Sequence, residues 1–176
     1  MTITIGGLAG SGKTTVSKLI VDQMGLRYVS MGSLFRQMAD RRQMSLSDFG
    51  AYAEQHPEVD KEIDRKQSEI VGNEGVVLDS RLGGWLAHRK KTRTLKVWLR
   101  AETECRVQRI AGRDGLSYEE TLAGIRAREL SETKRYRAFY DIDLSDLRCY
   151  DLVVDTTHLE PGAIARAIST LASAFQ

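Results

Sequence analysis

Residues 7–14 read G-L-A-G-S-G-K-T and follow a short apolar run, Ile3-Thr4-Ile5. This stretch satisfies every fixed position of the phosphate-binding loop pattern G-x-x-x-x-G-K-[S/T]. In such a loop, small residues let consecutive backbone N–H groups curl around a phosphate, and the helix that follows directs its positive end at it. The sequence therefore predicts a strand, a phosphate-binding loop and a helix at the start of the chain.

Two residues of this loop carry specific chemistry. Lys13 is expected to reach the β- and γ-phosphate oxygens of a nucleoside triphosphate, and the Thr14 hydroxyl is expected to ligate Mg²⁺. Val16, Leu19, Ile20 and Met24 then repeat at helical spacing, and the helix is expected to stop at Gly25. We expect the nucleotide to bind along the whole loop: Gly7, Leu8, Ala9, Gly10, Ser11, Gly12, Lys13, Thr14 and Thr15.

Beyond the loop, apolar runs and helical periodicities alternate. Crossovers of helical length between strands imply a parallel sheet covered on both faces. The expected fold is therefore α/β, a three-layer sandwich of the P-loop NTPase type with a five-stranded parallel sheet. The expected strands cover 3–5, 26–29, 75–78, 95–99 and 150–154, and further helices cover 33–43, 46–55, 58–72, 102–112, 117–138 and 162–175.

Composition limits the class of protein. The 176 residues suit one domain, and Lys plus Arg number 26 against 24 Asp plus Glu, so no global charge favours nucleic acid or a membrane surface. Neither a secretory leader nor a membrane span is predicted, so we expect a cytoplasmic enzyme. Cys105 and Cys149 are expected to be free thiols, and the three histidines are not spaced as metal ligands.

An acid and a base follow the strand expected near residue 78. Asp79 emerges from this apolar strand, where in phosphate-loop proteins an acid usually holds Mg²⁺ or a water on it. The alternative is a solvated acid at the end of a strand. Arg81, two residues on, points the same way while the chain stays extended and could grip an anion beside the metal.

Arginines recur after the second, third and fourth expected strands. Arg109 and Arg113 share one helical face, and Arg128, Glu132 and Arg135 form a stripe at i, i+4 and i+7. Solvated surface and mutual salt bridges are the alternatives. Hydrolysis of a nucleotide needs one arginine, whereas transfer between two phosphate-bearing molecules needs several. The number of arginines, with those at 36 and 81, therefore favours a kinase.

Several segments together resemble the archaeal-type cytidylate kinases, a family of nucleoside monophosphate kinases. The resemblance extends over nearly the whole chain, although Asp79-Ser80-Arg81 stands where that family usually has E-G-R. The segments are the loop G-L-A-G-S-G-K-T-T, Y-V-S-M-G-S-L-F-R at 28–36, M-S-L-S-D-F at 44–49, P-E-V-D-K-E-I-D at 57–64, R-L-G-G-W-L at 81–86, D-G-L-S-Y-E-E at 114–120, R-Y at 135–136 and Y-D-I-D at 140–143.

This resemblance implies phosphorylation of CMP or dCMP by ATP with Mg²⁺. We expect the protein to be a monomer. The resemblance also implies one nucleoside monophosphate kinase domain over 1–176, with a monophosphate-binding insertion at about 31–73 and a lid at about 112–135. Asp79 would reach the metal through water, and residues 155–157 would lie against adenine. The catalytic residues would be Lys13, Arg81, Arg128 and Arg135, and ATP would be served by Arg109 and Arg113. The acceptor would be bound by Ser33, Arg36, Arg81, Gly84, Trp85 and Glu132, although Trp85 fits a core position equally well.

Two other classes remain open at this stage. One is a kinase of a different small acceptor, such as AMP, UMP or a sugar acid. The other is a nucleotide-sensing switch, which the absence of an N-K-x-D motif and the long helical insertion disfavour. RNA or DNA binding is least favoured, because basic residues are balanced by acids and no aromatic-basic platform occurs.

Overall fold

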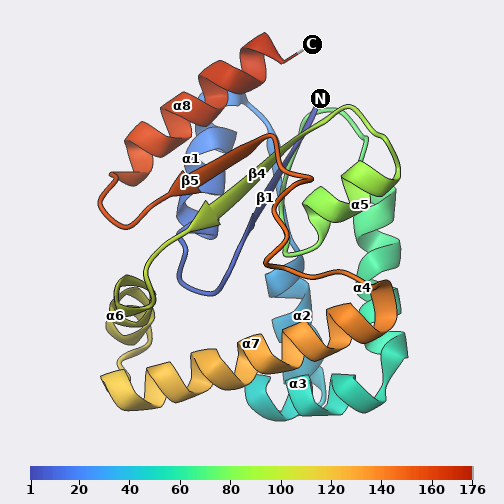
Figure 1. The fold of residues 1–176 in the computed structure, drawn as a ribbon, viewed down its shortest axis with the longest axis vertical. Coiled ribbons are helices and arrows are strands. Elements are labelled where there is room, and N and C mark those ends of the chain that lie inside the picture. The colour runs from blue at the N-terminus through green and yellow to red at the C-terminus, as the bar shows by residue number, and fades with distance from the viewer. Residues whose placement is uncertain (176) are drawn as a thin grey trace.

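The computed structural model of the protein describes residues 1–175 (Figure 1). Strands and helices alternate along the chain, as expected. The elements are β1 (Thr2–Gly7), α1 (Lys13–Met24), β2 (Arg27–Ser30), α2 (Met31–Arg41), α3 (Leu46–Gln55), α4 (Pro57–Ile70), β3 (Val76–Asp79), α5 (Gly83–Arg89), β4 (Thr94–Arg100), α6 (Thr103–Asp114), α7 (Tyr118–Tyr140), β5 (Leu152–Asp155) and α8 (Pro161–Ala174).

The sheet is five-stranded and parallel throughout, in the order β2-β3-β1-β4-β5. This confirms the expected α/β fold. β1 lies at the centre, with Ile5 in register with Asp79 of β3 on one side and with Val97 of β4 on the other. The loop after β1 therefore emerges between the ends of β3 and β4, at the sheet edge where parallel α/β folds bind ligands.

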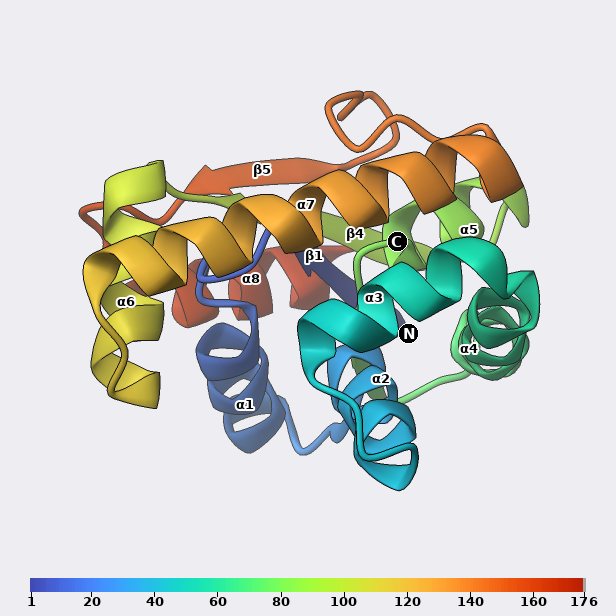
Figure 2. The ribbon, with the colours of Figure 1, turned by 90° about the horizontal axis from the view of Figure 1, so that it is seen from below.

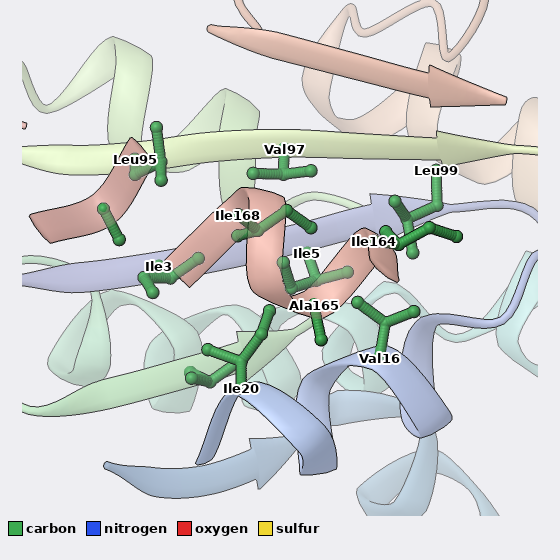
Figure 3. Packing of buried hydrophobic residues seen from close by; sticks show 12 residues of the cluster. Ile3, Ile5, Val16, Ile20, Leu95, Val97, Leu99, Ile164, Ala165 and Ile168 are labelled. Carbon is green, nitrogen blue, oxygen red and sulfur yellow. The ribbon is translucent and has the colours of Figure 1, made fainter. Parts of the chain in front are cut away.

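One face of the sheet is covered by α1 and α8. Ile3 and Ile5 of β1 are fully buried and point toward Ile20 of α1 and Ile168 of α8, as Figure 3 shows. The alternate residues Thr2 and Thr4 are also buried, so β1 is covered on both faces, as a central parallel strand must be.

The opposite face is covered in part by α5, a helix that the sequence analysis missed. It contacts β1 and β4. The helix is short and begins with Gly83-Gly84, and glycines are poor helix formers, so no helical pattern is visible in the sequence. Gly83 fits because a Cβ built there would lie only 3.2 Å from Leu78 and 3.3 Å from Thr4.

The stretch between β2 and β3 forms three helices, α2, α3 and α4, close to the ranges expected from the sequence. They pack around their own hydrophobic cluster, in which Phe49 and Val59 are buried. Leu78 of β3 and Ala87 of α5 belong to the same cluster and attach it to the sheet.

The long helix α7 crosses the end of the molecule near α6 and α3 (Figure 2). Its N-terminus has a capping box: the Ser117 side chain accepts from the Glu120 N–H, and the Glu120 side chain accepts from the Ser117 N–H. No helix within 1–175 combines the length and the apolarity that crossing a bilayer requires.

Ile5→Ala should lower the free energy of unfolding by about 2–5 kcal/mol, because it leaves a cavity at the centre of the sheet. Urea denaturation monitored by circular dichroism measures the change. Leu130→Ala on α7 is the matched control, since Leu130 is 58% exposed and its loss should change stability little. Equal losses in the two variants would contradict this assignment of the core.

Candidate active site

A cavity of about 780 Å³ opens at the carboxyl ends of the strands. Its lining comes from the phosphate-binding loop, the ends of β2 and β3, and the helices α2, α4, α6, α7 and α8. A volume in this range is typical of sites for small molecules. The cavity brings together most of the residues that the sequence analysis selected.

The loop after β1 has the geometry of a phosphate cradle. Gly10 and Gly12 adopt φ of 80° and 88°, which favours glycine, and a Cβ at Gly10 would lie 2.7 Å from the carbonyl oxygen of Arg106. Gly12 is the N-cap of α1, so the helix directs its free N–H groups into the loop. Lys13 Nζ donates to the Leu8 carbonyl at 2.9 Å, which folds the lysine back over the loop.

The charge of Lys13 depends on its surroundings. Burial and the nearby Arg81 together lower the pKa of Lys13 to about 7, although Asp79 opposes them. Without a ligand, the site is therefore short of negative charge. A bound triphosphate would supply that charge and favour the ammonium form.

Thr14, Asp79 and Tyr28 form a small oxygen cluster beside the loop. Asp79 Oδ2 accepts from Thr14 Oγ1 at 2.9 Å and from the Tyr28 hydroxyl at 3.0 Å. Burial, together with the charge of Asp79, raises the pKa of Tyr28. Residues 1–175 contain no group of three His, Cys, Asp or Glu side chains that could hold a metal. Mg²⁺ commonly uses one or two protein oxygens together with substrate phosphates, so Thr14 and Asp79 fit it.

Arg81 connects the end of β3 to the loop and to α7. Its Nε donates to Glu132 Oε2 at 2.5 Å, and its Nη1 donates to the Gly7 carbonyl. Arg128 Nε donates to the other carboxylate oxygen of Glu132 at 2.9 Å. Burial alone would raise the pKa of Glu132, but Arg81 and Arg128 outweigh it and lower that pKa to about 2.

Arg135, the last member of the α7 stripe, pairs with α4. Its Nη1 lies 2.6 Å from both carboxylate oxygens of Asp60, and its guanidinium lies 5.3 Å from the centre of the Phe35 ring. Burial raises the pKa of Asp60, and Arg135 opposes this shift. The stripe therefore does form salt bridges. Its acidic partners are Glu132 of α7 itself and Asp60 of α4, and both line the cavity.

Arg109 ties the loop after β5 to the phosphate-binding loop. Its Nη1 donates to Thr156 Oγ1 at 3.0 Å and to the Gly10 carbonyl at 3.4 Å, and its Nη2 donates to the Thr156 carbonyl at 2.6 Å. Arg113 also lines the cavity and pairs with Asp114 at the surface. These are the two arginines that the family resemblance assigns to ATP.

Three residues that the sequence analysis assigned to the acceptor do not line the cavity: Ser33, Gly84 and Trp85. Arg36 lines the cavity and donates to Ser33 Oγ at 3.1 Å, but Ser33 itself does not line it. Gly84 is buried against Tyr150, and a Cβ built at Gly84 would lie 2.4 Å from the Tyr150 ring. Trp85 packs in a cluster with Leu82, which supports its core alternative. Neither Gly84 nor Trp85 lines the cavity.

The sequence analysis did not select several residues that line the cavity or hold the phosphate-binding loop in place. Arg106 Nη1 donates to the Ala9 carbonyl at 3.1 Å and braces the loop. Asp60, Asp64 and Gln67 line the cavity from one face of α4. Their spacing of four and three residues was visible in the sequence and could have indicated a polar face turned toward the site.

The fold is that of a P-loop kinase. Shikimate kinase from Bacteroides thetaiotaomicron superposes with a TM-score of 0.59 at 13% identity, over 98% of each chain. A putative kinase from Chloroflexus aurantiacus gives 0.60 at 17% identity, over 96% of each chain. At these identities the likeness concerns the fold alone.

Sequence comparison places the chain more narrowly. The Cytidylate kinase-like family model matches residues 2–158, so the chain belongs to this family, and the resemblance noted in the sequence is confirmed. The cytidylate kinase of Pyrococcus horikoshii is 45% identical over 93% of this chain and 84% of its own length. The cytidylate kinase of Methanocaldococcus jannaschii is 43% identical over 97% of this chain and 96% of its own length.

Glu132→Gln should destabilise the protein at neutral pH, because it leaves Arg81 buried without its counter-ion. A carboxylate whose pKa is lowered from 4.5 to about 2 stabilises the fold above pH 4.5 and loses that contribution as the pH falls toward 2. The stability gap between wild type and variant should therefore shrink over this range. Urea denaturation at several pH values measures it, with the exposed Glu119→Gln as control. A gap independent of pH would contradict the pairing.

Proposed function

We propose that this protein transfers the γ-phosphoryl group of ATP to the 5′-phosphate of CMP, with dCMP as a second acceptor. One observation carries the proposal: a phosphate-binding loop, the arginine that follows β3 and two arginines of α7 converge on one cavity. Family membership and the relatives named cytidylate kinase support it. Several arginines are what a transfer between two phosphate-bearing molecules requires.

The sheet order suggests where each nucleotide binds. The phosphate-binding loop follows the central strand β1. Arg109, Leu159 and Pro161 line the cavity on the side of β4 and β5, and we assign this side to the donor base. α2, α4 and the end of β3 line it on the other side, which we assign to the acceptor. The two phosphate groups would then meet above the loop.

Transfer would proceed by positioning and charge neutralisation, with no covalent intermediate. Thr14 would ligate Mg²⁺ and Asp79 would hold it through water, and the ion would neutralise charge on the β- and γ-phosphates when bound. Lys13 would meet the charge that develops on the transferred group. It is well suited to this, because an arriving phosphate favours its ammonium form.

Arg81, Arg128 and Arg135 would hold the acceptor phosphate and the transferred group, with Arg36 at the entrance. In the free protein, Glu132 already binds Arg81 and Arg128 and keeps both guanidiniums in place. Such preorganisation reduces the entropy lost when a phosphate binds. Arg81 also retains a buried Nη2 that has no hydrogen-bond partner within residues 1–175 and could donate to a phosphate oxygen.

We further propose that the chain is a monomer of one domain, with an acceptor-binding insertion at about 31–73 and a lid at about 112–135. The segment from Gly112 to Ser117 is exposed, and it links α6 to the capped start of α7. Closure of this segment would exclude water, which otherwise competes with the acceptor.

The function is tested by coupled measurement of ADP release from ATP with CMP, dCMP, UMP, AMP and GMP. CMP and dCMP should be the best acceptors. Lys13→Ala should lower the rate at least about a hundredfold with the fold intact. Lys18→Ala, an exposed lysine on the same helix, is the control and should retain activity. ADP release that does not depend on any acceptor would favour the nucleotide switch instead.

The lid is tested by hydrogen exchange. An analogue that joins adenosine and cytidine through a phosphate chain should protect the amides of residues 113–136 more than ATP alone does, because closure requires both nucleotides. Amides of α8 serve as the internal control and should respond equally to both ligands. Equal protection of 113–136 by ATP alone, or none with either ligand, would rule out a lid that responds to two substrates.

A further inference from the structure

The polar face of α4 contains two residues to which the transfer chemistry above gives no role. Asp60 is occupied by Arg135, but Asp64 and Gln67 also line the cavity. Gln67 is only 2% exposed, and Asp64 is half-buried. Polar side chains in such surroundings need partners, so their arrangement indicates what they can bind.

The orientation of Asp64 is fixed by a chain of hydrogen bonds that starts at the end of β3. Ser80 Oγ accepts from the N–H groups of Leu82 and Gly83 at 3.2 Å each, which leaves its proton to donate to Gln67 Oε1. Gln67 Nε2 in turn donates to Asp64 Oδ1 at 3.1 Å. Ser80 is one of the residues by which this chain departs from the E-G-R of similar sequences.

Asp64 is unsuited to contact a phosphate. No salt bridge joins it to a cation within residues 1–175. Burial and the neighbouring Asp60 together raise its pKa to about 6, although Tyr140 and Gln67 oppose the shift. An acid that is easily protonated and borders the acceptor side of the cavity is instead suited to a neutral heterocycle that has both a donor and an acceptor.

We infer that the Asp64 carboxyl group, oriented by Gln67, binds the 4-amino and N3 edge of the acceptor base and thereby selects cytosine over uracil. This inference rests on the proposed function. One oxygen of the protonated carboxyl group accepts from the 4-amino group, and the other donates its proton to a hydrogen bond with N3. Two hydrogen bonds form and no covalent bond breaks. Ile63 and Phe35, which also line the cavity, provide apolar contacts for the ring.

Uracil presents the opposite pattern at this edge, an O4 acceptor and an N3–H donor. An ionised carboxylate can accept from N3–H, but its second oxygen then faces O4, and the two oxygens repel because neither has a proton to donate. A protonated carboxyl can satisfy both groups only by reversing its orientation, and the bond from Gln67 Nε2 to Oδ1 opposes this, because the amide needs an oxygen that accepts. Discrimination therefore depends on the fixed orientation.

Asp64→Asn tests this inference. An amide can present its N–H₂ to N3 and its oxygen to the amino group of cytosine, and after rotation it can satisfy uracil equally well. The variant should therefore keep CMP activity within about tenfold, while the ratio of kcat/KM for CMP to that for UMP falls at least about tenfold. Glu62→Gln, an exposed change of the same kind on α4, should leave the ratio unchanged.

A fall of less than tenfold in this ratio would overturn the inference. If the wild-type protein itself failed to phosphorylate CMP, the proposed function would be wrong instead, so the two failures are distinguishable. The wild-type protein gives a reading that does not depend on a variant folding. The monophosphate of 3-deazacytidine, which lacks the N3 acceptor, should be used at least about tenfold less efficiently than CMP, and equal use would overturn the inference.

Discussion

The contact between Arg81 and Glu132 joins the three parts of the site. Arg81 follows the end of β3, its guanidinium donates to the carbonyl of Gly7 in the phosphate-binding loop, and Glu132 lies in the middle of α7. Both side chains are almost completely buried. Loss of one member of such a pair typically costs about 3–5 kcal/mol, because the other charge stays buried alone. The loop, the sheet and α7 are thus held together by one interaction that also belongs to the phosphate site.

The sheet was predictable because its strands are apolar and its connections are of helical length. The apolar run at 95–99 is typical of a buried parallel strand and shows no helical periodicity. The glycines of the phosphate-binding loop indicate the strand before them and the helix after them. α5 was not predictable, since its helical state depends on close packing of Gly83 against Thr4 and of Gly84 against Tyr150. That packing joins residues far apart in the sequence, which no local pattern records.

The same distinction holds for the site. Lys13, Thr14, Asp79 and Arg81 carry their roles in local motifs, and the structure brings them together around one cavity. The partner of Arg135 was not visible, because Asp60 is distant from it in sequence, and the two meet only because α4 and α7 both pack against α3. Tyr28 was missed for a similar reason: its hydroxyl reaches Asp79 only because β2 pairs with β3.

The helices between β2 and β3 have a hydrophobic cluster separate from the one that joins the sheet to α1 and α8. Substitutions on α2, α3 and α4 therefore alter the acceptor side while leaving the central packing of the molecule undisturbed. On the donor side, Arg109 ties Thr156 directly to the phosphate-binding loop, so a change there reaches the cradle itself. Under the division of the cavity proposed above, acceptor specificity can change through substitutions that spare the central core, whereas a change on the donor side disturbs the phosphate-binding loop.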